Sequence, residues 1–239
     1  MSEPAIGARS RERWLRRAER AKDAFGLVLL LALATYVLAS LLDNRGWSAV
    51  ILTVAAGATS VVALTSSHVE VRFVRLAIWI SALTVGLAAV AAISGAHVWL
   101  NLASAIQISM LTLAMGAVLR RVVTTGDVGS RTILGAISVY IVLGILFTFL
   151  YGLVARIQGG PFFQGVPQPD GGDFLFFSYT TLTTTGYGNL VPGGQPGRMI
   201  AGLEMMLGQI FLVTLVAGLV SLWRPGQALR RRQQKRAEA

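Results

Sequence analysis

The stretch Asp173–Asn189 reads DFLFFSYTTLTTTGYGN and combines two unlike halves. Its first half, Asp173–Thr183, holds about eleven apolar and hydroxyl-bearing residues, too few for a helix that crosses a bilayer. Asp173 is a good helix N-cap, and its negative charge suits the positive end of a helix dipole. The second half, Thr184–Asn189, contains two glycines and is expected to be non-helical. We therefore predict a short helix that ends in an irregular loop.

The composition around this stretch is that of an integral membrane protein. The chain has 239 residues, of which 54% are hydrophobic and only 13% charged, whereas a soluble domain carries about 25% charged residues. This balance excludes a soluble enzyme, a disordered protein and a fibrous repeat. The sequence contains no cysteine, which excludes a disulfide framework and a cysteine-based metal site.

Six apolar segments have the length that a membrane-spanning helix needs, about 17–25 residues. Buried helices of a large soluble protein would need amphipathic partners to cover them, and the chain has none to spare. We therefore predict an all-α membrane protein whose short helix re-enters the membrane between the last two spans. Non-helical backbone is tolerated at that depth only if it is buried in protein or lines a water-filled path. The predicted spans are Phe25–Leu42, Trp47–Leu64, Phe73–Ser94, Val98–Leu119, Ile133–Val154 and Met199–Leu222.

The positive charges lie mainly on one side of these spans. Most of the 21 Lys and Arg residues precede the first span, follow the last, or lie in the second–third and fourth–fifth connections. The positive-inside rule then predicts that both termini are cytoplasmic, which an even number of spans requires. The net charge of +10 therefore indicates topology, and no nucleic-acid partner is needed to explain it. Residues 1–24 are predicted either to lie as an amphipathic helix on the anionic inner leaflet or to be a solvated tail.

The five residues Thr184-Thr185-Gly186-Tyr187-Gly188 closely resemble the selectivity filter of potassium channels, usually Thr-Val-Gly-Tyr-Gly. The resemblance runs from about Ile133 to Leu222 and includes the helices on either side. It implies a bacterial plasma-membrane channel with six helices and one filter per chain. It also implies that K⁺ binds the backbone carbonyls of Thr184, Thr185, Gly186 and Tyr187 and the Thr184 hydroxyl, while Gly186 and Gly188 adopt positive φ.

One filter segment cannot encircle an ion, and the chain has no second copy of the motif. Several chains must therefore close the ring, and the family arrangement is a homotetramer. The expected function is passive K⁺ conduction, without enzyme activity and with no cofactor except K⁺ ions in the filter. Two alternatives stay open: a weakly selective cation channel, and a non-conducting membrane scaffold or transporter subunit.

The sequence departs from the family at several positions. Thr185 stands where valine is usual, Asn189 where aspartate is usual, and Phe176 and Phe177 where many members have two tryptophans. In such members the tryptophans donate hydrogen bonds behind the filter, and phenylalanine has no donor. Either these supports are missing, or Thr180, Thr181 or Tyr179 replaces them.

The last span contains two further candidates. Glu204 is an ionisable residue inside a membrane span, which by default is a functional-site hypothesis. We favour a structural role for Glu204 behind the filter or behind the pore helix, which is the short helix before the filter. The alternative is that its side chain reaches the extracellular vestibule. Gly208 stands where many such channels have a hinge glycine. Gln209 is expected to bond a neighbouring helix, and so are Asn101 and Gln107 of the fourth helix.

The first four helices lack the charges of a voltage sensor. Val98–Leu119 contains no arginine, and Arg120 and Arg121 stand at its cytoplasmic end. About seventeen residues follow Leu222, too few for a nucleotide- or calcium-binding fold, so the stimulus that opens the channel is not predicted. The short fourth–fifth connection favours a peripheral bundle that sits on its own pore. The predicted domains are a basic N-terminus (1–24), a peripheral four-helix domain (25–130), a pore domain (131–222) and a basic tail (223–239).

Overall fold

The computed structural model describes residues 25–42, 46–124 and 130–222, and every regular element in these ranges is a helix. The predictions for residues 1–24 and 223–239 lie outside the described ranges. The helices are α2 (Phe25–Leu41), α3 (Gly46–Ser66), α4 (Val71–Ser94), α5 (His97–Thr124), α6 (Ser130–Ile157), α7 (Gly171–Leu182) and α8 (Gln195–Leu222).

Five of the described helices, α3, α4, α5, α6 and α8, are long and apolar enough to cross a membrane. The sixth predicted span, α2, is also apolar but has only 17 residues. The chain is thus a multi-pass membrane protein. The helices extend beyond the predicted spans at several ends, because polar residues continue the helical hydrogen bonding there. As a result α5 includes Arg120 and Arg121, and α6 includes Arg156, which the sequence placed in a connection.

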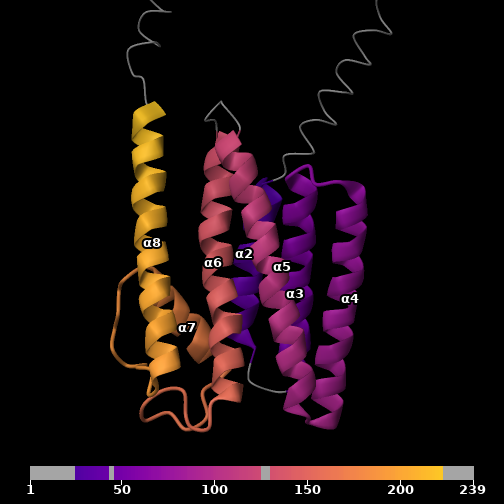
Figure 1. Ribbon diagram of the computed structural model, residues 1–239, viewed down its shortest axis with the longest axis vertical. Helices are drawn as coiled ribbons and strands as arrows, with labels where there is room; N and C mark the ends of the chain where they lie inside the picture. The colour runs from indigo at the N-terminus through magenta and orange to yellow at the C-terminus, as the bar shows by residue number, and fades with distance from the viewer. Residues whose placement is uncertain (1–24, 43–45, 125–129, 223–239) are drawn as a thin grey trace, which may run out of the picture.

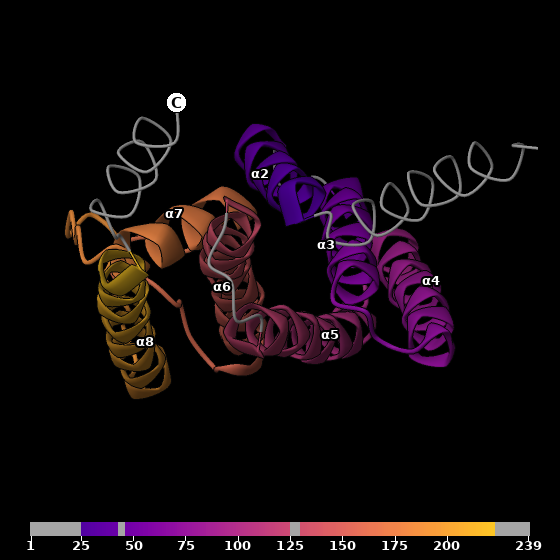
Figure 2. The ribbon, with the colours of Figure 1, turned by 90° about the horizontal axis from the view of Figure 1, so that it is seen from above.

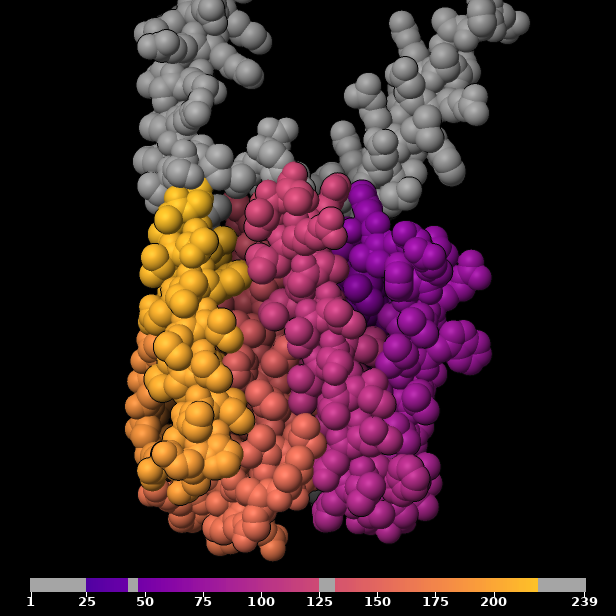
Figure 3. All heavy atoms as spheres, in the orientation of Figure 1, coloured from indigo at the N-terminus to yellow at the C-terminus, as the bar shows by residue number. Residues whose placement is uncertain are grey.

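The long helices run side by side, and α6 stands between two groups of helices (Figures 1 and 2). On one side α2–α5 form a peripheral bundle in which α3 packs on α2, α4 and α5. This bundle contacts α6 through α2 and α5, within the same chain. On the other side α7 packs between α6 and α8 and contacts both. Helix α8 forms one flank of the molecule (Figure 3).

Apolar side chains of α6 form the centre of the main core. Tyr151, Ile145 and Leu146 are buried there against residues of α7 and of the connection that precedes it. In that connection Phe162 and Phe163 are almost fully buried, and Phe163 forms isolated bridges to Val166 and Pro192. The connection is therefore fixed to the core by two aromatic rings, although its glycine-rich ends are exposed or half-buried. A second cluster, with Phe25, Val28, Val118 and Val139 among its members, joins α2, α5 and α6.

Candidate functional site

The short helix α7 begins three residues before the position that the sequence predicted. Its N-cap is Asp170, whose Oδ1 accepts a hydrogen bond from the backbone N–H of Asp173 at 2.8 Å. The Asp173 carboxylate in turn accepts from the backbone N–H of Asp170 at 3.0 Å. The prediction that Asp173 is the N-cap is wrong. This reciprocal capping box satisfies two otherwise free N–H groups, so the helix starts at the earlier aspartate.

Two tyrosines fix α7 against α6. The Tyr179 hydroxyl donates to the backbone oxygen of Ile141 at 2.6 Å, and the Tyr140 hydroxyl donates to that of Leu182 at 3.2 Å. The Tyr179 ring lies directly on Gly144, where a Cβ atom would come within 2.6 Å of it. On its other side, Tyr179 meets the ring of Tyr36 edge-on, with centroids 4.9 Å apart. The peripheral bundle therefore touches α7 directly through α2.

Glu204 is fully buried and links three helices. Its Oε2 accepts a hydrogen bond from the Tyr151 hydroxyl of α6 at 2.5 Å, and its Oε1 lies 2.6 Å from the Ser178 hydroxyl of α7. The Ser178 oxygen is also 2.8 Å from the backbone oxygen of Gly144. Glu204 thus contacts α7, and its side chain is buried within the chain rather than exposed to solvent.

The protons available for these contacts can be counted. Three contacts join Glu204, Tyr151, Ser178 and the Gly144 carbonyl, and each requires one proton. The two hydroxyl groups supply one proton each. A neutral Glu204 carboxyl supplies the third by donating to Ser178, which then donates to Gly144. An ionised carboxylate would leave one contact without a proton and would carry a buried charge at high cost.

In the loop after α7 the sign of the backbone angle φ alternates from one residue to the next. Thr184, Gly186 and Gly188 have φ of 57°, 53° and 79°, and Thr185 and Tyr187 between them have no positive φ. The two glycines have the positive φ expected from the sequence. Thr184 was not predicted to do so, because a β-branched residue pays a steric cost in that region. Alternation of this kind turns successive carbonyl groups towards one side of the chain.

Hydrogen bonds hold the start of this loop to α7 and α8. The backbone N–H groups of Thr185 and Gly186 both donate to the carbonyl oxygen of Thr180, at 2.8 and 3.2 Å. The Gln209 side chain of α8 donates from Nε2 to the Thr184 hydroxyl at 3.0 Å. We had expected Gln209 to bond a neighbouring helix. The structure instead brings its amide to the strained residue of the loop, and nothing in the sequence spacing indicates this contact.

The two phenylalanines at the tryptophan positions have different surroundings. Phe176 stacks on the ring of Tyr187, with centroids 5.7 Å apart and planes 16° apart. Phe177 instead joins the aromatic cluster of the core, with its centroid 5.0 Å from that of Tyr151 and 5.1 Å from that of Phe163. Tyr187 is therefore supported within its own chain by ring stacking.

The side chains of Thr180, Thr181 and Tyr179, which could replace the tryptophan donors behind the filter, have other partners or surroundings. The Thr180 hydroxyl donates to the carbonyl of Phe177 in its own helix, and the Tyr179 hydroxyl is bound to Ile141. Thr181 is buried, and its carbonyl accepts the N–H of Thr184. Asn189 is exposed at the end of the loop. None of these side chains forms a hydrogen bond to Tyr187 within the described part of the chain.

Gly208 lies where α8 crosses the end of α7. A Cβ atom at this position would collide with the Leu182 carbonyl oxygen, so only glycine permits the contact. In this structure α8 is a continuous helix from Gln195 to Leu222. Close packing therefore accounts for the glycine, and a hinge at Gly208 stays a prediction.

Taken together, residues 171–222 form a short capped helix, a loop of alternating hand at its C-terminal end, and a long helix that braces both. Residues 135–224 match the protein family described as "Ion channel". Over these residues the chain is similar to ion channels. The ion channel match indicates that the protein is not an enzyme, in agreement with the prediction. Sequence reasoning identified its loop and Glu204 but missed Gly144, Tyr151 and Ser178, whose roles depend on contacts between distant helices.

A curated relative of this chain is a cyclic nucleotide-gated potassium channel from Rhizobium etli. The two are 33% identical over 92 residues, which is 38% of this chain and 24% of the relative. The chain thus matches about a quarter of the length of that relative. The match supports the predicted relationship to the potassium channel family.

Proposed function

We propose that this protein is a passive potassium channel whose ions bind the loop Thr184–Gly188. The observation that carries the proposal is the alternating hand of this loop at the C-terminal end of α7. Carbonyl oxygens turned towards one side replace the water that K⁺ loses on entry. The Thr184 hydroxyl, fixed by Gln209, adds an oxygen at the inner end. The negative end of the α7 dipole favours a cation beside it.

We further propose that four chains close the pore. The loop of a single chain is exposed, with 71% of the Tyr187 surface accessible, and it contacts an ion from one side only. The outer face of α8 is likewise apolar and accessible, at Leu203, Met206 and Ile210 among others. A cyclic arrangement of identical chains places both surfaces in contact with a neighbour. In this arrangement the six helices α2–α6 and α8 span the plasma membrane with both termini in the cytoplasm.

Flux through purified protein in liposomes tests the proposal. We expect K⁺ and Rb⁺ to pass well over Na⁺. Gly186→Val should abolish the flux, because a β-branched residue disfavours the positive φ of Gly186. Gly116→Ala is the matched control, since a Cβ atom at that glycine of α5 meets nothing within 4 Å. Flux that is equally lost or equally retained in both variants would contradict a filter at this loop.

A weakly selective cation channel is the second candidate, and Thr185 and Asn189 favour it. Neither residue is the usual one at its position, and the two flank the central glycines. Reversal potentials in mixed K⁺ and Na⁺ separate the candidates, because equal permeabilities would support this second function. No flux at all from a protein that is folded and tetrameric would support a scaffold or a transporter subunit.

A further inference from the structure

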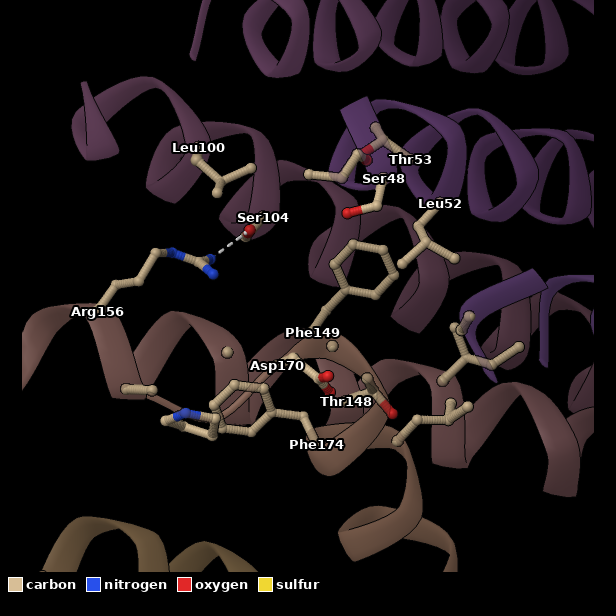
Figure 4. Close-up of a pocket in the computed structure, with 18 of the residues that line it drawn as sticks. Ser48, Leu52, Thr53, Leu100, Ser104, Thr148, Phe149, Arg156, Asp170 and Phe174 are labelled. Carbon is tan, nitrogen blue, oxygen red and sulfur yellow. Dashed lines mark hydrogen bonds between the residues drawn. The ribbon is translucent and has the colours of Figure 1, made fainter. Parts of the chain in front are cut away.

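A cavity of about 520 Å³ lies between the peripheral bundle and the ion channel domain, at the end of the molecule where α6 ends (Figure 4). Its walls come from α2, α3, α5, α6 and the start of α7. This volume falls in the range of about 300–1,000 Å³ that is typical of small-molecule sites. The cavity is separate from the filter loop, because no residue from Thr184 to Asn189 lines it.

The cavity is charged at its outer end and mainly apolar deeper in. On α6 its lining runs from Ile145 to Arg156, which at 1.5 Å per residue is a depth of about 16 Å. Arg156 is the penultimate residue of the helix, so its charge lies near the mouth. Ile145 and Phe149 of α6 and Leu52 of α3 form its apolar wall, and the hydroxyl-bearing Thr53 and Thr148 also line it. A site of this shape fits an amphiphile with its headgroup at the mouth.

The Arg156 guanidinium has only uncharged partners among the described residues. Its Nε donates to Asn101 Oδ1 and its Nη2 to Ser104 Oγ, each at 2.7 Å. No described acidic side chain lies within the 4.0 Å of an ion pair. Gly152 leaves room for the group, since a Cβ atom there would lie 3.3 Å from Nη1. Because a partly buried cation is costly without a counter-charge, the remaining N–H donors favour an anionic ligand.

The same cavity also contains a negative charge, which narrows the choice of ligand. Asp170 lines it with a carboxylate that accepts the Asp173 N–H of the α7 capping box. A headgroup with net negative charge would be repelled by this carboxylate, whereas a zwitterionic headgroup is complementary to both residues.

We propose that the cavity binds one membrane phospholipid with a phosphoethanolamine headgroup. Its phosphate lies on the Arg156 guanidinium and its ammonium group faces Asp170. One acyl chain lies along the apolar wall between α3 and α6. The lipid then occupies the junction between the peripheral bundle and α7.

Native mass spectrometry of the purified full-length protein, titrated with lipid, tests this site. We expect one saturable phosphatidylethanolamine per subunit, and weaker binding of phosphatidylglycerol. Arg156→Gln should weaken phosphatidylethanolamine binding about tenfold or more, the loss expected for a charge-assisted hydrogen bond. Arg75→Gln is the charge-matched control on exposed α4, at the opposite end of the bundle, and should bind as the parent does.

A second variant keeps Arg156 and its hydrogen bonds intact. Leu52→Trp fills part of the cavity, so it should reduce binding of the lipid even if Arg156→Gln fails to fold. Equal binding by the parent and Leu52→Trp would overturn the proposal. So would binding of inorganic phosphate that displaces the lipid and is unaffected by Leu52→Trp, since that identifies a free-anion site. The readout does not depend on ion flux, so it succeeds or fails independently of the channel function.

Discussion

At the scale of single residues, Glu204 holds the short helix α7 to both long helices that flank it. Its two oxygens contact hydroxyl groups of Tyr151 and Ser178, and no part of it is accessible to solvent. The sequence indicated the residue, because a carboxyl group inside a membrane span stands out. The partners could not be predicted, because serine and tyrosine are common in such helices and only the packing of three helices selects these two.

Removing this carboxyl should destabilise the protein. Glu204→Ala leaves the buried Tyr151 hydroxyl without an acceptor and opens a cavity, while Ser178 keeps its bond to Gly144; the expected cost is about 3 kcal/mol. Glu204→Gln should be close to neutral, because its amide can donate to Ser178 while its oxygen accepts from Tyr151. Thermal unfolding in lipid nanodiscs measures both. An alanine variant as stable as the parent, or a glutamine variant as unstable as alanine, would show that the proton count is wrong.

Phe176 provides a second test at this scale. A filter tyrosine supported by ring stacking rather than by donated hydrogen bonds has competing conformations separated by small free energies, and bound K⁺ favours the conductive one. Lower K⁺ should therefore reduce the steady-state current of the parent. Phe176→Leu, which removes the stacking on Tyr187, should shift this dependence to higher K⁺.

The reverse change should have the opposite effect. Phe176→Trp and Phe177→Trp combined with Asn189→Asp restore the donors and acceptor of the usual family pattern. This triple variant should keep its current at lower K⁺ than the parent does. Identical K⁺ dependence in the parent, Phe176→Leu and the triple variant would place the gate away from the filter.

At the scale of elements, most helices follow from the length and polarity of their segments. The start of α7 could not be predicted in this way. Two aspartates three residues apart are both good caps, and the choice between them depends on the two hydrogen bonds that they exchange. The burial of Phe162 and Phe163 was also missed. A glycine- and proline-rich connection predicts exposed coil, and only the space between α6, α7 and α8 shows where two aromatic rings can be buried.

The crossing of α7 and α8 makes a sharp prediction. Gly208→Ala forces α8 away from the Leu182 carbonyl. This should lower the free energy of unfolding by about 1–3 kcal/mol and lower the K⁺ flux. Gly202→Ala, on the same helix, meets nothing within 4 Å and should be neutral or slightly stabilising. Unfolding and flux measured side by side decide the matter. If both glycines tolerate alanine equally, the close crossing does not exist.

The charge content of α5 leads to a prediction about voltage. A charge that crosses the full membrane field contributes about 2.3 kcal/mol per 100 mV, and α5 has no arginine or lysine before Arg120. The open probability should therefore change only shallowly with voltage, apart from effects of ions in the filter. Arg120→Gln with Arg121→Gln should leave the voltage dependence unchanged. A steep activation curve that this pair abolishes would make α5 a voltage sensor.

At the scale of the whole molecule, the peripheral bundle packs on the α6 of its own chain. Gly26 of α2 lies next to Leu134 of α6, where a Cβ atom at position 26 is 3.9 Å from a Leu134 methyl group. Because the chain has no cysteine, Gly26→Cys with Leu134→Cys provides a clean pair for a short thiol cross-linker. We expect the link to form within one chain, so that the denatured product has the mass of a monomer. Gly26→Cys alone is the control, and linked multimers of the double variant would indicate exchange of bundles between subunits.

Packing within one chain also bears on how such a channel is made in the cell. Each newly synthesised chain can complete the contacts of α2–α7 before it meets another copy. If four chains then combine as proposed, each ring takes its subunits at random from the membrane. Suppose that a cell produces equal amounts of intact and filter-defective subunits. Only about one tetramer in sixteen would then consist of intact subunits alone. A single defective gene copy would thus suppress most of the current carried by the healthy one.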